Sequence, residues 1–143
     1  MTNDAPLRLA MWSGPRNIST AMMRAWENRD DTVVWDEPLY AYYLRETASD
    51  HPDASKVMQA GEPDWRTVVA KAIGTVPQSK TIFFQKHMAH HLLQEMDWDW
   101  LGQVTNCFLI QDPREVIACY VRTRPLQMLA FHNRRKSLTA SRA

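Results

Sequence analysis

Short apolar runs alternate along the chain with longer segments whose apolar residues recur at helical spacing. The apolar runs predict β-strands at residues 7–12, 32–35, 81–84 and 104–110. The intervening and following segments predict helices at residues 19–29, 38–48, 65–74, 88–95 and 113–124. Residues 49–64 contain Pro52, Gly61 and Pro63 and predict an irregular loop.

Alternating strands and helices favour parallel pairing with right-handed crossovers, hence an α/β three-layer sandwich around a parallel sheet of about four strands. In such open sheets, ligands bind beyond the carboxyl ends of the strands. Polar residues follow each predicted strand, at positions 13–16, 36–37, 86–87 and 111–114. We therefore expect these groups to meet at one edge of the sheet.

The segment after the first predicted strand has the features of an anion-binding turn. It leads from a short loop into a helix, whose first N–H groups lack backbone partners and lie at the positive end of the helix dipole. We expect the two hydroxyl residues to cap this helix. A capped surface turn with one exposed arginine is the alternative. The segment contains, in order, Gly14, Pro15, Arg16, Asn17, Ser19 and Thr20.

Size and composition indicate an ordinary soluble globular domain. The chain has 143 residues, of which 45% are hydrophobic and 23% charged. No apolar stretch approaches the roughly 20 residues of a membrane span, and the N-terminus does not resemble a secretory signal. Cys107 and Cys119 form no disulfide or metal pattern. We therefore expect a cytoplasmic protein without a membrane partner.

Charge is unevenly distributed, because residues 126–143 contain four basic residues and no acidic one. Aromatic residues are not interleaved with these charges beyond Phe131, so nucleic-acid binding is disfavoured and a poorly ordered tail is expected. The predicted domains are residues 1–125 and the basic tail 126–143.

The histidines after the third predicted strand raise the question of a metal. His87 lies three residues before His90, but zinc needs a further ligand and neither cysteine is near in sequence. We expect no metal site. Two alternatives are left open. Either Lys86 or His87 contacts the substrate or sulfate, or both are ordinary polar residues at a helix start.

The turn at residues 14–20 lacks the Gly-Lys pair of the nucleotide-hydrolysing P-loop signature. It resembles instead the 5′-phosphosulfate loop of the sulfotransferases, a branch of the P-loop fold. Pro15, Arg16, Ser19 and Thr20 match that loop, while Asn17 and Ile18 replace its Ser-Gly pair.

The fourth strand and its helix carry a second resemblance. Asp112, Pro113 and Glu115 form a coherent helix start that is close to a capping box. In sulfotransferases an Arg just before the Asp/Asn-Pro pair, and a Ser about eight residues later, bind the nucleotide 3′-phosphate. Gln111 and Cys119 occupy those positions here.

A neutral amide and a thiol bind phosphate less well than a guanidinium and a hydroxyl. We therefore expect a lower affinity for 3′-phosphoadenosine ligands, unless Arg114 or Arg122 substitutes.

The resemblance covers residues 7–125 and implies a bacterial-type sulfotransferase fold that is incomplete at the C-terminus, as in a truncated or frame-shifted gene. It implies transfer of a sulfuryl group from 3′-phosphoadenylyl sulfate to a hydroxyl or amine of a small molecule, without a metal. Glu37 would take the acceptor proton, and Arg16 with the amides of Ser19 and Thr20 would hold the 5′-phosphosulfate. A homodimer is left open.

Two other functions remain alternatives. A nucleotide-dependent phosphotransferase would need Mg²⁺ ligands, for which Asp36, Glu37 and Asp112 are the candidates. A degenerate domain would bind an anion or a partner chain without turnover. Gln111 and Cys119 favour this alternative.

Overall fold

The computed structural model describes residues 5–48 and 54–123. The chain divides into two compact units, one that ends at Ile110 and one that begins at Gln111. The predicted domain boundary after residue 125 and the basic tail lie outside the described residues and stay predictions.

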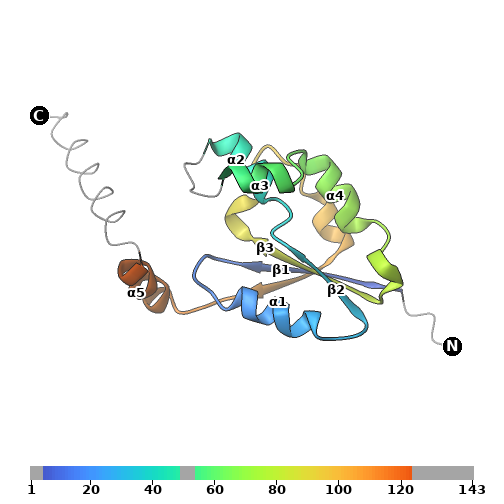
Figure 1. Ribbon diagram of the computed structural model, residues 1–143, viewed down its shortest axis with the longest axis horizontal. Coiled ribbons are helices and arrows are strands. Elements are labelled where there is room, and N and C mark those ends of the chain that lie inside the picture. Colours follow the sequence, from blue (N-terminus) through green and yellow to red (C-terminus); the bar gives the residue numbers. More distant parts are fainter. Residues whose placement is uncertain (1–4, 49–53, 124–143) are drawn as a thin grey trace, which may run out of the picture. The chain divides into compact units, whose positions relative to one another are not determined.

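The first unit is built on a parallel sheet of four strands (Figure 1). These are β1 (Leu7–Ser13), β2 (Thr32–Asp36), β3 (Ile82–Met88) and β4 (Thr105–Leu109), in the spatial order β2-β3-β1-β4. All three strand pairs are parallel, and Asp36 of β2 and Met11 of β1 both lie opposite Lys86 of β3. The α/β prediction is confirmed.

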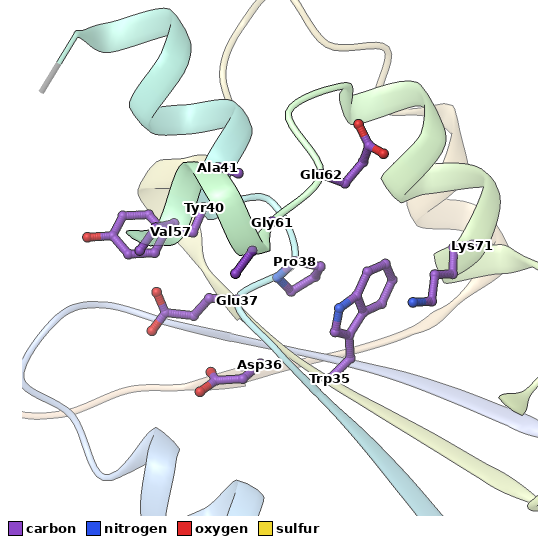
Figure 2. A pocket seen from close by; sticks show the side chains of 11 residues that line it. Trp35, Asp36, Glu37, Pro38, Tyr40, Ala41, Val57, Gly61, Glu62 and Lys71 are labelled. Atoms are coloured by element: carbon purple, nitrogen blue, oxygen red, sulfur yellow. The ribbon is translucent and has the colours of Figure 1, made fainter. Parts of the chain in front are cut away.

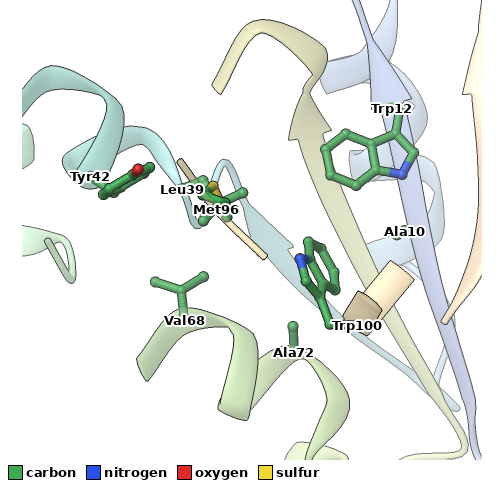
Figure 3. Packing of buried hydrophobic residues seen from close by; sticks show 8 residues of the cluster. All are labelled: Ala10, Trp12, Leu39, Tyr42, Val68, Ala72, Met96 and Trp100. Atoms are coloured by element: carbon green, nitrogen blue, oxygen red, sulfur yellow. The ribbon is translucent and has the colours of Figure 1, made fainter. Parts of the chain in front are cut away.

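Helices cover both faces of this sheet. On one face, α1 (Ser19–Glu27) packs Met23 against Met11 and Phe84. On the other face lie α2 (Tyr40–Thr47), α3 (Ala54–Ala60) and α4 (Trp65–Ile73) (Figure 1). There Val68 of α4 joins Trp12 and Trp100 in a buried cluster (Figure 3). Side chains of successive strand residues point to opposite faces, so β1 contributes to both layers.

Two predicted elements were wrong. Residues 88–95 are not a helix, because β3 continues through Met88 and is followed by a single 3₁₀ turn, Ala89–His91. The predicted loop at residues 49–64 contains the helix α3. Further 3₁₀ turns, which were not predicted, span Pro77–Ser79 and Asp99–Gln103.

β3 is longer than predicted because its three polar residues are buried with partners. Gln85 donates from Nε2 to the Ala72 carbonyl at 2.8 Å, and its Oε1 lies 3.2 Å from His87 Nε2. The His87 ring also stacks on Trp12, with 4.4 Å between ring centroids. Burial lowers the pKa of His87 to about 3, so the imidazole is neutral inside the first unit.

The second unit contains α5 (Pro113–Thr123). Asp112 Oδ1 accepts from the Arg114 backbone N–H at 2.8 Å, so the predicted cap is confirmed. Glu115 Oε2 accepts from Gln111 Nε2 at 3.2 Å. Within the described ranges, helices are too short or too polar to cross a membrane.

Candidate active site

The loop after β1 has the predicted strand-loop-helix form, but its helix begins differently. The N-cap residue is Ile18, and none of the described side chains caps α1, so the prediction that Ser19 and Thr20 cap it was wrong. Ser19 is instead the first helical residue and is buried. Asn17 organises the loop, since its Oδ1 accepts from the Ile18 N–H and its Nδ2 donates to the Leu109 carbonyl, both at 3.0 Å. The first turn of α1 thus offers its amides to a ligand.

Two residues of the predicted site have left-handed backbones. Arg16, in the loop after β1, has φ 61°, and Glu37, directly after β2, has φ 43°. Non-glycine residues rarely adopt this conformation, which costs on the order of 1 kcal/mol and is concentrated at functional sites. β1 and β2 are aligned in a parallel sheet, so both residues follow strand ends at the same edge.

The side chain of Lys86 joins two carboxylates at that edge. Its Nζ lies 2.8 Å from Asp36 Oδ1 and 2.7 Å from Glu37 Oε1. The lysine side chain is 3% exposed, whereas those of Asp36 and Glu37 are 49% and 26% exposed. Burial lowers the pKa of Lys86, but the bonds to both carboxylates outweigh it, so the pKa lies above its ordinary value. Lys86 is therefore a fixed positive charge.

Backbone bonds hold Glu37 in place as well. Its N–H donates to the Lys86 carbonyl at 2.9 Å, and its own carbonyl accepts from the Tyr40 N–H at 3.0 Å. Glu37 thus links the end of β2 to β3 and to the start of α2. Contacts of both its main chain and its side chain therefore hold the Glu37 carboxylate in one orientation.

A pocket of about 520 Å³ opens beside Glu37 (Figure 2). Its walls come from the end of β2, the start of α2, α3 and α4. The predicted site included Glu37 but missed the residues from α3 and α4, which lie in or after the segment predicted as a loop. The lining residues are Trp35, Asp36, Glu37, Pro38, Tyr40, Ala41, Val57, Ala60, Gly61, Glu62 and Lys71.

The structure separates the two polar residues at the end of β3. Lys86 reaches the carboxylates, whereas His87 is buried against Trp12 on the other face of the strand. His91 is buried too and stacks on Tyr40 and Tyr43. Over the described ranges, no group of three or more His, Cys, Asp or Glu side chains is placed to hold a metal ion.

The remaining predicted residues belong to the second unit. Gln111 precedes α5 and donates to Glu115, as described above, and Cys119 lies on α5. Arg114, considered as a substitute for the missing family arginine, is bonded to Asp112 with Nη2 2.7 Å from Oδ2. Its guanidinium is therefore already paired within the second unit.

Comparison with known proteins places these features in a family. Residues 7–128 match the model of a sulfotransferase domain. Two Arabidopsis thaliana proteins are similar: branched-chain-amino-acid aminotransferase-like protein 2, 32% identical over 114 residues, and protein 1, 31% identical over 119 residues. The alignments cover 80% and 82% of this chain but 20% and 21% of the relatives.

The chain thus spans about a fifth of the length of these curated relatives. No solved structure matches it. The family model covers most of the chain, including the loop after β1, the Glu37 turn and the Asp112-Pro113 helix start. The protein belongs to the sulfotransferase domain family.

Proposed function

We propose that this protein transfers a sulfuryl group from 3′-phosphoadenylyl sulfate to a hydroxyl or amine of a small molecule. The observation that carries the proposal is the oriented carboxylate of Glu37, held by Lys86 at the sheet edge where β1 ends and its following loop begins. A carboxylate at that place is suited to accept a proton from an attacking hydroxyl.

The loop after β1 is assigned to the 5′-phosphosulfate of the donor. Arg16 supplies a positive charge, and the amides of Ser19 and Thr20 lie in the uncapped first turn of α1. Gly14, Pro15 and Asn17 shape the loop. The same groups stabilise the negative charge that develops on the leaving phosphate.

With a hydroxyl acceptor, the reaction is a displacement at sulfur. The acceptor oxygen forms a bond to sulfur, and the bond between sulfur and the bridging oxygen of the donor breaks. The bond's electron pair leaves on the 5′-phosphate of adenosine 3′,5′-bisphosphate. Glu37 takes the acceptor proton. The reaction needs alignment and charge stabilisation, and no metal takes part in it.

Gln111 and Cys119 are assigned to the donor's 3′-phosphate, by their positions in the family pattern. Because neither side chain is charged, the proposed donor affinity is lower than with Arg and Ser at these positions. This departure favours a second candidate, a domain that binds the anion without turnover.

A magnesium-dependent phosphotransferase is less well supported. Its candidate ligands Asp36 and Glu37 are both bonded to the Lys86 ammonium, which lies where a cation between the two carboxylates would bind.

Calorimetric titration with adenosine 3′,5′-bisphosphate in the absence of Mg²⁺ tests the proposal. We expect binding that Arg16→Ala weakens at least about tenfold, since a charge-assisted contact to the phosphate is lost. Arg29→Ala, at the far end of α1, is the matched control and should leave the affinity unchanged. Mg²⁺-dependent binding of ATP would support the phosphotransferase instead. Binding of adenosine 3′,5′-bisphosphate without any sulfuryl transfer would support the second candidate.

A further inference from the structure

The pocket beside Glu37 has a mixed lining that restricts what it can bind. Pro38, Ala41 and Val57 contribute apolar surface, and the aromatic ring of Trp35 forms part of the wall (Figure 2). Its volume of about 520 Å³ falls within the range of small-molecule sites. An apolar body of modest size fits these walls.

The pocket has more negatively than positively charged groups. Three carboxylates line it, from Asp36, Glu37 and Glu62, together with one ammonium, from Lys71. The Lys71 Nζ lies 4.4 Å from the centroid of the Trp35 ring, so this cation already has an aromatic partner. Lys86 adds a second positive charge, bonded to both Asp36 and Glu37. The pocket therefore keeps one uncompensated negative charge.

The carboxylates lie in two separate places. In the view of Figure 2, Pro38 and Gly61 lie between Glu37 and Glu62. Asp36 and Glu37 are bonded to Lys86, whereas Glu62 accepts through Oε1 from the Asp64 N–H at 2.9 Å. Glu62 is an exposed residue at the rim. Glu62 also lines the pocket, so it provides a negative site separate from Glu37 where a positive group of a ligand can be held.

We propose that this pocket is the acceptor subsite and takes a small hydroxyl compound with an apolar body and a protonated amine. This inference rests on the proposed function, because Glu37 is taken as the base for the hydroxyl. A protonated amine has no free electron pair and does not attack sulfur. The hydroxyl is therefore the nucleophile, and the ammonium group serves recognition at the Glu62 end. Anionic acceptors are disfavoured by the charge of the pocket.

Three para-substituted phenols test the inference: tyramine, 4-methylphenol and 4-hydroxyphenylacetate, whose para groups are positive, neutral and negative. Their binding to the full chain is measured by NMR titration without donor. We expect tyramine to bind at least about tenfold more tightly than 4-hydroxyphenylacetate, with 4-methylphenol between them.

Glu62→Gln should weaken tyramine several-fold and leave 4-methylphenol unchanged, because the amide can still accept from the Asp64 N–H. Glu27→Gln, an exposed carboxylate on α1, is the matched control and should change neither affinity. Equal affinities for the three phenols, tightest binding of 4-hydroxyphenylacetate, or binding of none of them would overturn the inference.

Titration of the same samples with adenosine 3′,5′-bisphosphate separates the two proposals. Donor-product binding without a preference for tyramine refutes the acceptor class and retains the sulfotransferase. A preference for tyramine without donor-product binding supports the assigned pocket chemistry and refutes the donor.

Discussion

Glu37 is bonded to Lys86 through both main chain and side chain. The Glu37 N–H donates to the Lys86 carbonyl at 2.9 Å, and the Lys86 ammonium lies 2.7 Å from Glu37 Oε1. Since Glu37 also has a left-handed backbone, its turn depends on these contacts. The pair explains how a residue at the end of an edge strand is held in one orientation.

Replacing the lysine should therefore disturb both stability and activity. We expect Lys86→Met to lower the free energy of unfolding by about 1–3 kcal/mol, less than for a fully buried pair because both carboxylates keep contact with water. Sulfuryl transfer should fall as well, since Glu37 loses its orientation. Denaturant unfolding and a transfer assay measure the two effects. Lys80→Met, near the start of β3, is the control. Unchanged stability and activity in Lys86→Met would contradict this account.

Glu37 itself is tested by an isosteric change. Glu37→Gln should lower kcat by about 10²–10⁴-fold, the usual contribution of a general base. Affinity for adenosine 3′,5′-bisphosphate should change little, because the base contacts the acceptor. Steady-state kinetics and calorimetry separate these quantities, with Glu27→Gln as the control. A variant that retains full kcat would remove Glu37 from the proposed mechanism.

Gly61 tests the packing of the pocket wall. A Cβ added at this position would lie 2.7 Å from Ala41 Cβ and 2.9 Å from the Val57 carbonyl oxygen, so α2 and α3 would have to separate. We expect Gly61→Ala to destabilise the protein by about 1–3 kcal/mol, as overpacking does. At Gly102 the added Cβ meets nothing within 4 Å, which makes Gly102→Ala the matched control. Thermal unfolding compares the two, and equal midpoints would argue against the close contact.

The buried histidines predict a loss of stability in acid. Burial lowers the pKa of His87 and of His91 to about 3, and for His91 electrostatic interaction with His90, His87 and Lys86 lowers the pKa further. A depressed pKa in the folded state gives stability that is fully present above the unfolded pKa of about 6.5 and is lost as pH falls toward 3. Each histidine contributes a slope of up to about 1.4 kcal/mol per pH unit in that window.

His91→Phe should remove one of these slopes and keep an aromatic ring beside Tyr40 and Tyr43. Urea unfolding of both proteins from pH 4 to pH 8 measures the difference. The slopes should agree above pH 7, where the histidine is neutral in both states. Equal slopes below pH 6 would show that His91 titrates normally in the folded protein.

The assignment of Gln111 and Cys119 to the donor's 3′-phosphate is tested by restoring the family residues at these two positions. The double variant Gln111→Arg, Cys119→Ser should bind adenosine 3′,5′-bisphosphate at least about tenfold more tightly, since a charge-assisted bond replaces a neutral one. Gln103→Arg adds the same charge in the first unit and serves as the control. Equal affinity of the double variant and the parent chain would count against the alignment of α5 with the family pattern.

Sequence patterns predicted the strands well because each strand has apolar residues that must be buried. They failed at the end of β3, where Gln85 and His87 appeared too polar for a strand interior. Both are accommodated by partners from distant segments, Ala72 and Trp12. Such long-range partners are invisible to a local pattern. The helix α3 was missed for another reason: none of its seven residues is buried, so a pattern of buried apolar positions does not mark it.

Local chemistry by itself determined the parallel α/β architecture, the turn after β1 and the start of α5, because periodicity, turn residues and caps act within a few positions of one another. The resemblance to sulfotransferases marked Glu37 as a candidate base. Only the tertiary structure decided that Lys86 bonds Glu37 while His87 is buried, and that α3 and α4 complete a pocket beside them. Those relationships join residues far apart in the chain, and they depend on strand register and side-chain packing, which no short stretch of sequence specifies.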